Sequence, residues 1–391
     1  MRFGVFGGTF DPIHNAHIAV AEAASRQYEL DRVYLVVAAS PPHKQGERTS
    51  AHIRYDMVRR ACEDSERLVA SDIELSRQGK SYTVDTLAEL ISKNPHDEWF
   101  LIVGADMLES FGTWREPERI LQMARLVATG RMRIDLVAAA RRLEREFGAT
   151  VALLDMDELP LSSTGIRRAV ASAQSIRGSV PEQVAMCIYE HGCYMDESYA
   201  AMRDGIRRDL SQARYMHSIG TAYTSVEMAA VFGVDGHKAR VAGLLHDCAK
   251  LPAHGAQFEL AREYGMDEAL ELPRGVLHAP LSAKRARSMY AVDDAEILSA
   301  IEFHTTGRAN MSALEKVVLV ADKAEPTRSY WGVEKLRRLA YSDLNAAVVC
   351  AMDRGISHAR ARGQSIFEGT LAARDYIIKE QSDRGERDGG E

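Results

Sequence analysis

Cysteine is scarce in this sequence, and long apolar runs are missing from it. The five cysteines among 391 residues form no C-x-x-C pair, which fits a reducing compartment better than a disulfide framework. No stretch of eighteen apolar residues occurs, and the opening residues MRFGVFGG lack the apolar core of a signal peptide. We therefore expect a cytoplasmic protein with no membrane partner.

An excess of positive charge is also missing. The chain has 49 lysines and arginines against 56 aspartates and glutamates, a formal net charge of -7. This balance argues against a general nucleic-acid-binding protein, so any polyphosphate site must be locally basic. At 391 residues the chain is long enough for two domains, each with a sizeable core.

The first half alternates strand-like and helical segments. This alternation predicts an α/β, Rossmann-like parallel sheet with helices on both faces and ligands at the carboxyl ends of its strands. The expected strands are 3–6, 33–37, 69–73, 99–103, 126–129 and 151–154, and the expected helices include 17–28, 54–63, 83–93 and 134–147.

A glycine turn follows the first expected strand, in the run GGTFDPIHNAH at 7–17. It matches neither G-x-G-x-x-G nor a Walker loop, but two glycines allow close backbone approach and the next helix offers free amides to phosphate. His14 and His17 are three residues apart, so we expect them on one helical face where they can donate to phosphate oxygens. The alternative is a plain turn with two surface histidines.

This run is similar to the signature of nucleotidyltransferases with the H-x-G-H motif, and it resembles the bacterial nicotinate-nucleotide adenylyltransferases most. A second block, LSSTGIR at 161–167, resembles the family's I-S-S-T-x-I-R motif. Between the two lie PPHK at 41–44, SYTVDT at 81–86, GAD at 104–106 and Trp114, in the family's order. The chain departs from the pattern at Ala16, where glycine is usual, and at Leu161, where isoleucine is usual. Alanine is small, so we still expect ATP to bind.

The resemblance implies that a mononucleotide phosphate attacks the α-phosphorus of ATP, with Mg²⁺ bridging the ATP phosphates. It implies catalytic roles for His14, His17 and Lys44, with His17 stabilising the transition state. The implied ATP-binding residues are Gly7, Gly8, Thr9, Phe10, His17, Gly104, Asp106, Ser163, Thr164 and Arg167. Nicotinate mononucleotide would contact Lys44, Thr83 and Trp114. Simpler explanations are that the serines only cap a helix and that Trp114 is a half-buried aromatic residue.

The second half loses the strand pattern and becomes rich in alanine with helical periodicity. We expect an all-α domain there, with the boundary near Asp196. The expected divisions are an adenylyltransferase domain over 1–196, a helical domain over 197–380 and a disordered, charged, glycine-containing tail over 381–391.

Widely spaced histidines and aspartates carry the chemistry of the second half. The adjacent His246 and Asp247 end an apolar run, where a buried imidazole and carboxylate need partners that a metal can supply. The full set resembles the H…HD…H…H…D ligands of HD-domain phosphohydrolases: His217, His246, Asp247, His278, His304 and Asp322. The contexts RYMHS, GLLHDCAK, HTTG and ADKAEP are similar to the subfamily that splits diadenosine tetraphosphate into two ADP.

This second resemblance implies two divalent ions, Fe, Mn or similar, that share Asp247. Asp247 and Lys250 are the expected catalytic residues, and Lys250 lies one turn after His246 and can reach the same phosphates. Thr305, Thr306 and Arg328 are further candidates.

Together the two halves predict a bifunctional enzyme whose partners are ATP, nicotinate mononucleotide and diadenosine tetraphosphate. Three alternatives remain open. The first domain could use another acceptor, such as nicotinamide mononucleotide or phosphopantetheine. The helical domain could be a regulatory nucleotide-binding module, or it could hydrolyse other phosphate esters.

Overall fold

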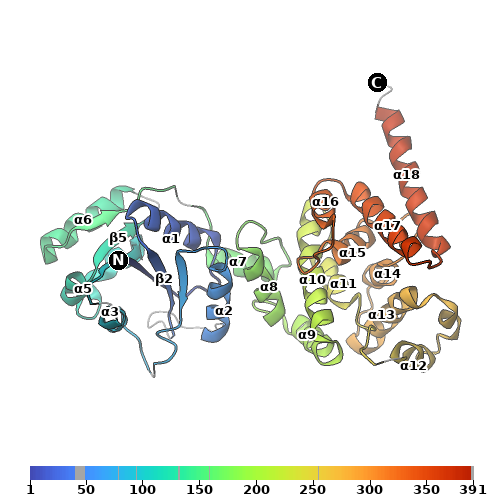
Figure 1. Ribbon diagram of the computed structural model, residues 1–391, viewed down its shortest axis with the longest axis horizontal. Coiled ribbons are helices and arrows are strands. Elements are labelled where there is room, and N and C mark those ends of the chain that lie inside the picture. The colour runs from blue at the N-terminus through green and yellow to red at the C-terminus, as the bar shows by residue number, and fades with distance from the viewer. Residues whose placement is uncertain are drawn as a thin grey trace. The chain divides into compact units, whose positions relative to one another are not determined.

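The computed structural model describes residues 1–39, 49–77, 79–93, 95–130, 133–157, 159–253 and 255–388 (Figure 1). The chain forms two compact units. The first comprises Met1–Arg167 and Arg177–His191, and the second comprises Arg168–Ile176 and Gly192–Glu391. Within the described ranges, no helix combines the length and apolar character needed to cross a membrane.

The first unit is built on a parallel sheet of six strands in the order β3-β2-β1-β4-β5-β6. The strands are β1 (Arg2–Gly8), β2 (Arg32–Val37), β3 (Leu68–Ser71), β4 (Glu98–Gly104), β5 (Arg125–Thr129) and β6 (Val151–Leu153). Apolar residues fill most of the central strands β1 and β4, as expected where both faces of a parallel sheet are covered. The predicted Rossmann-like fold is confirmed, and all six predicted strands are present.

Helices cover both faces of this sheet. The helices that pack on it are α1 (Asn15–Gln27), α2 (Ala51–Ala61), α3 (Thr83–Lys93), α4 (Ala105–Ser110), α5 (Pro117–Met123) and α6 (Arg133–Phe147). Two further helices follow, α7 (Ser163–Ala171) and α8 (Glu182–His191), and α8 packs against α2. One face, which includes Val5 and Leu101, packs against α3, α5 and α6. The helices α1 and α2 contact β1, β2 and β3, as Figure 1 shows for the blue part of the chain.

The order of the parallel strands changes direction between β1 and β4: β2 and β3 lie on one side of β1, whereas β4, β5 and β6 lie on the other. The strands β1 and β4 are neighbours, with Phe6 opposite Ile102, although about ninety residues separate them in the sequence. Their carboxyl ends, Gly8 and Gly104, therefore lie side by side. In open parallel sheets, such a switch point is where ligands bind.

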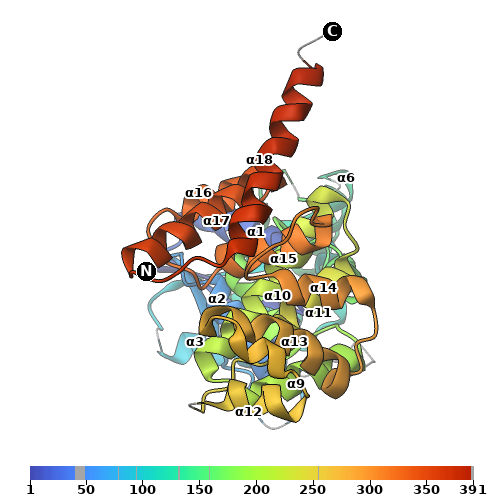
Figure 2. The ribbon, with the colours of Figure 1, turned by 90° about the vertical axis from the view of Figure 1, so that its right-hand side faces the viewer.

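The described residues of the second unit form helices and loops, which confirms the predicted helical domain. Its helices are α9 (Glu197–Asp209), α10 (Gln212–Phe232), α11 (Gly236–Leu245), α12 (Ala256–Glu263), α13 (Arg274–Tyr290), α14 (Ala295–Phe303), α15 (Ala313–Ala324), α16 (Val333–Leu339), α17 (Leu344–Ala361) and α18 (Glu368–Asp388). The long α10 is buried along most of its length and packs against α11 and α15 (Figure 2).

The division between the units differs from the predicted boundary near Asp196. Asp196 caps α9, and its side chain accepts from the Tyr199 amide at 2.8 Å. Residues 168–176, however, pack with the second unit because two buried charged side chains bind their backbone. Arg240 donates to the Val170 carbonyl at 3.0 Å, and Glu227 accepts from the Ile176 amide at 3.0 Å.

The end of the chain also differs from the prediction. A disordered tail is expected from Gln381, whereas α18 continues to Asp388. The residues between these positions include no proline, so none of them removes a backbone donor and forces the helix to stop.

Candidate functional sites

The glycine turn at the end of β1 is shaped by close packing around Phe10. A Cβ on Gly8 would lie 2.8 Å from the Phe10 ring, so glycine is required there. Phe10 itself has a left-handed backbone (φ 48°) and is buried. Its ring contacts Phe6 and His17, with centroids 5.8 and 5.1 Å away. This packing offsets the backbone strain and fixes the path of the turn.

His14 caps α1 instead of lying within it, which corrects the predicted shared helical face. The two imidazoles nevertheless meet, since the rings of His14 and His17 stack with centroids 3.7 Å apart. The His14 amide donates to His17 Nδ1 at 3.2 Å. A neutral His17 ring therefore carries its proton on Nε2, which makes that nitrogen a hydrogen-bond donor. Burial lowers the pKa of His14 to about 4, so His14 is neutral at pH 7.

The second motif joins the first one at this turn. Ser162 caps α7 by accepting from the Gly165 amide at 3.1 Å, as the simpler explanation expects. Ser163 Oγ donates to the Pro12 carbonyl at 2.9 Å, and Arg167 Nη1 donates to the Asp11 carbonyl at 2.8 Å. The structure thus places the start of α7 against a loop about 150 residues earlier in the chain, and Arg167 also reaches Thr164 Oγ1 at 3.2 Å.

The remaining candidates of the first site lie on neighbouring loops. Asp106 is in the first turn of α4, which begins directly after Gly104. Thr83 begins α3, and Trp114 follows a short 3-10 turn where it packs on Phe111. The start of α3 and the Trp114 loop are tied together because Arg115 stacks over the Tyr82 ring at 4.8 Å. Lys44 and its neighbours lie outside the described residues.

Arg54 is a structural residue of this site that the sequence did not reveal. Only 2% of it is exposed, and its guanidinium donates to the carbonyls of Thr9, Ala38 and Thr49 at 2.6, 2.9 and 3.1 Å. It therefore holds the loop after β1 in place. A signal did exist: Arg54 shares the buried face of α2 with Met57, Val58 and Ala61, where an arginine needs buried acceptors.

In the second unit, five helices bring the six predicted metal ligands together. His217 lies on α10, His278 on α13 and Asp322 on α15, while His246 and His304 end α11 and α14. Every one of these side chains is buried.

Asp247 lies at the centre of this cluster and divides it into two donor sets. Its Oδ2 is 3.6 Å from His217 Nε2 and 3.4 Å from His246 Nε2. Its Oδ1 is 3.4 Å from the Nε2 atoms of both His278 and His304. Asp322 Oδ1 completes the first set, at 3.0 Å from His217 Nε2 and 3.7 Å from His246 Nε2.

The tautomers of three of these histidines follow from their second nitrogen. His246 Nδ1 lies 2.8 Å from the Gly243 carbonyl, and His304 Nδ1 lies 2.6 Å from the Ile301 carbonyl. His217 Nδ1 lies 3.1 Å from a carboxylate oxygen of Glu325. These oxygens only accept, so the Nδ1 atoms carry the protons and the Nε2 lone pairs point into the cluster.

This donor set fits a pair of divalent cations. The Nε2 atoms of His217 and His246 are 3.1 Å apart, where two lone pairs repel each other unless a metal ion lies beside both or a proton lies between them. Ligands held about 2.0–2.1 Å from one ion are separated by roughly 2.9–3.4 Å, which agrees with this spacing. Burial alone would raise the pKa of Asp247, but His246 and Lys250 outweigh it and keep that pKa well below its usual value. Imidazoles with an ionised carboxylate suit transition-metal ions.

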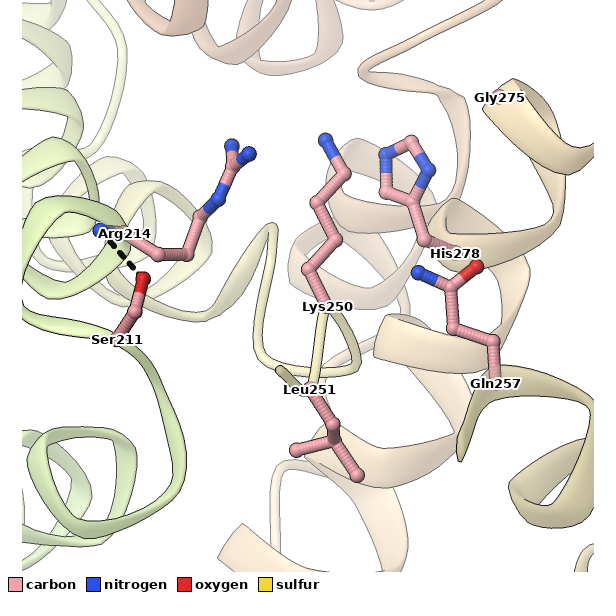
Figure 3. Close-up of a pocket in the computed structure, with 7 residues that line it drawn as sticks. All are labelled: Ser211, Arg214, Lys250, Leu251, Gln257, Gly275 and His278. Atoms are coloured by element: carbon pink, nitrogen blue, oxygen red, sulfur yellow. Dashed lines mark hydrogen bonds between the residues drawn. The ribbon is translucent and has the colours of Figure 1, made fainter. Parts of the chain in front are cut away.

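A basic pocket of about 360 Å³ opens beside Asp247 (Figure 3). Arg214 and Lys250 project into it and approach Asp247, with Nη1 2.7 Å from Oδ2 and Nζ 3.0 Å from Oδ1. Ser211, Gln257 and Gly275 also line the pocket, and they lie at the amino ends of α10, α12 and α13. The two positively charged side chains, together with the amino ends of three helices, favour the binding of an anion in this pocket.

Of the three further candidates in the helical domain, Thr305 and Arg328 contact the metal-ligand cluster. Thr305 Oγ1 is 3.0 Å from His278 Nε2, and Arg328 Nη2 is 2.8 Å from Asp322 Oδ1. Thr306 instead donates to the Gly307 carbonyl. Arg214 was not predicted, although its position three residues before His217 places both on one face of α10.

Known proteins resemble each half of the chain. The profile of the cytidylyltransferase-like family matches residues 5–169, and that of the HD domain matches 214–354. The probable nicotinate-nucleotide adenylyltransferase of Desulfitobacterium hafniense (strain Y51) is 40% identical over 197 residues, 49% of this chain and 95% of that protein. The corresponding protein of Thermus thermophilus is 43% identical over 194 residues, 50% of this chain and all of that protein. A solved structure from Clostridium acetobutylicum, described as a predicted HD superfamily hydrolase involved in NAD metabolism, is 37% identical and covers 46% of this chain and 97% of its own, with a TM-score of 0.43.

Proposed function

The first half of this chain belongs to the nicotinate-nucleotide adenylyltransferase family, and on that premise we propose that it transfers AMP from ATP to nicotinate mononucleotide. One observation carries the proposal. Ser163 and Arg167 bond to the loop after β1, so the two phosphate-binding motifs form one surface at the switch point of the sheet. The products would be deamido-NAD and pyrophosphate.

The reaction needs positioning and charge stabilisation but no covalent intermediate. The Nε2–H of His17 would donate to an ATP phosphate oxygen as negative charge develops there. Arg167, Thr164 and the amino end of α7 would hold the outgoing phosphates. Mg²⁺ bound to the ATP would neutralise part of their charge.

The acceptor and the nucleoside would bind on the loops around this surface. Asp106 would hold the ribose of ATP, directly after β4. Thr83 and Trp114 would contact the pyridine carboxylate and ring of nicotinate mononucleotide, and the Arg115 contact with Tyr82 supports this pairing of loops. Lys44 would assist from the segment after β2.

For the HD domain we propose hydrolysis of diadenosine tetraphosphate to two ADP. The position of Asp247, between two donor sets and beside a basic pocket, carries this proposal. Two divalent ions at these ligands would supply Lewis acidity and lower the pKa of a water molecule. Arg214 and Lys250 would neutralise the charge of the phosphate chain.

Product analysis with the full-length enzyme tests both proposals. The first half should convert ATP and nicotinate mononucleotide to deamido-NAD, and faster conversion of nicotinamide mononucleotide or phosphopantetheine would replace the proposed acceptor. The second half, loaded with Mn²⁺, should release only ADP from diadenosine tetraphosphate. Release of ATP and AMP, or no hydrolysis, would contradict the symmetrical reaction and favour another ester or a regulatory role.

A further inference from the structure

Glu325 is a buried carboxylate that the two proposed reactions leave without a role. It follows α15, three residues after Asp322, and is completely buried. Its Oε1 lies 3.1 Å from His217 Nδ1, as described above. Thr327 donates to both oxygens of the same carboxylate, from its amide and its hydroxyl, each at 2.6 Å.

We propose that Glu325 is a positioning residue that prepares His217 to bind one of the two metal ions. By accepting a hydrogen bond from Nδ1–H, the carboxylate fixes the tautomer in which Nε2 offers a lone pair toward Asp247 and Asp322. Its negative charge also makes that lone pair a stronger donor. The inference rests on the proposed metal centre but not on the identity of the substrate.

The carboxylate distinguishes His217 from the neighbouring histidines. The Nδ1 atoms of His246 and His304 donate to the backbone carbonyls of Gly243 and Ile301, which carry no formal charge. Among the three histidines whose Nδ1 partner is described, His217 alone is paired with a charged group. The donor set on the Oδ2 side of Asp247 is therefore the one that Glu325 strengthens.

The surroundings of Glu325 hold it in this position. A Cβ on Gly220 would overlap Glu325 Oε2, so the glycine on α10 makes room for the carboxylate one turn after His217. Arg337 donates to the carbonyls of Ala324, Glu325 and Arg328, at 2.9, 2.8 and 2.8 Å, and fixes the turn that follows α15. A carboxylate packed this closely orients an imidazole with little freedom.

Glu315 offers a matched control for a purely structural role. It is also a buried glutamate of α15, and it accepts from Arg308 Nε at 2.9 Å and from the Ser312 amide at 2.6 Å. Its described partners belong to the loop before α15 and to α14, not to the metal ligands. Removing it should cost stability to a similar degree without changing metal affinity.

The experiment titrates Mn²⁺ alone, without nucleotide, into metal-stripped full-length protein and follows free Mn²⁺ by electron paramagnetic resonance. Wild type should bind two ions. Glu325→Gln, which keeps an acceptor oxygen but loses the charge, and Glu325→Ala should weaken one of the two by about 10-fold and up to 100-fold, respectively. The other ion should bind within about threefold of wild type, and Glu315→Gln should bind both ions normally.

Unchanged binding of both ions by folded Glu325→Gln would overturn the positioning role, and so would an equal loss in Glu315→Gln. If Glu325→Ala fails to fold, the isosteric glutamine variant decides. A wild type that binds no Mn²⁺ would overturn the metal centre and this inference together. A wild type that binds two ions but leaves diadenosine tetraphosphate intact would overturn only the proposed substrate.

Discussion

Replacing Asp247 by asparagine should separate the two proposed activities. The side chain keeps its size but loses the charge that both donor sets share, since each oxygen faces a different pair of histidines at 3.4–3.6 Å. The set on Oδ1 would retain His278 and His304 with no carboxylate among the described ligands. The set on Oδ2 would still have Asp322.

The structure therefore predicts unequal losses. We expect the ion on the Oδ1 side to bind at least 100-fold more weakly, about 2.8 kcal/mol, because its anionic ligand is gone. The ion on the Oδ2 side should lose about tenfold, roughly 1.4 kcal/mol. Hydrolysis should fall by about 1,000-fold or more, because clamping a phosphate between two ions requires both. Deamido-NAD synthesis should stay within about twofold, since sites that share no residues or partners rarely couple strongly.

Three measurements on one preparation decide this prediction. Metal content after dialysis reports loading, chromatography of the products of diadenosine tetraphosphate reports hydrolysis, and release of pyrophosphate from ATP and nicotinate mononucleotide reports synthesis. An Asp247→Asn protein that keeps two ions and hydrolyses within tenfold of wild type would refute the bridging role. A folded variant whose synthesis falls more than fivefold would refute the independence of the two activities.

Three further predictions concern the first unit. His17→Ala should lower the turnover of synthesis by about a hundredfold with nearly unchanged ATP affinity, because the Nε2–H of His17 acts on charge that develops in the transition state. Steady-state kinetics and ATP titration measure the two quantities, and a normal turnover number would contradict this role. The pKa of His14 is depressed to about 4, so the unfolded chain binds an extra proton between about pH 6.5 and pH 4 and stability falls as the pH drops through that window, by roughly 3 kcal/mol at most. Denaturant unfolding of the nucleotide-free enzyme at pH 7 and pH 4.5 should show a smaller acid loss in His14→Asn, and equal losses would contradict the assignment. Arg54→Met should cost roughly 4 kcal/mol because buried carbonyls lose charge-assisted partners, and Arg54→Lys should restore little since one ammonium cannot serve three directions; an unfolding midpoint close to wild type would contradict this.

Much of the fold could be predicted from the sequence because each strand and long helix shows its own pattern of apolar residues within a few positions. Val33 and Leu126 lie in short apolar runs that only a covered strand explains, and those strands were predicted. The short helices α4 and α5 were not, since six or seven residues contain too few turns to show a periodicity. Residues 168–176 belong to the second unit because Arg240 and Glu227 bind their backbone. These contacts join residues more than fifty positions apart, so the local sequence did not predict them.

The candidate sites were predictable as lists of residues but not as arrangements. Motif spacing identified His246 and Asp247, yet which histidines face which oxygen of Asp247 depends on how five helices pack. Arg214 and Glu325 were not predicted because charged residues are common on helices, and only their contacts with Asp247 and His217 distinguish them. Lys44 remains a prediction.

The route of the chain between its two units has a consequence for evolution and for gene fusion. Because residues 168–176 belong with the helical unit and 177–191 return to the sheet unit, the backbone passes from one to the other three times. A single crossover between two related genes, wherever it falls after residue 167 and before residue 192, would therefore leave at least one unit with segments from both parents. Recombination should have tolerated such hybrids only when the partners of Arg240 and Glu227 were inherited together.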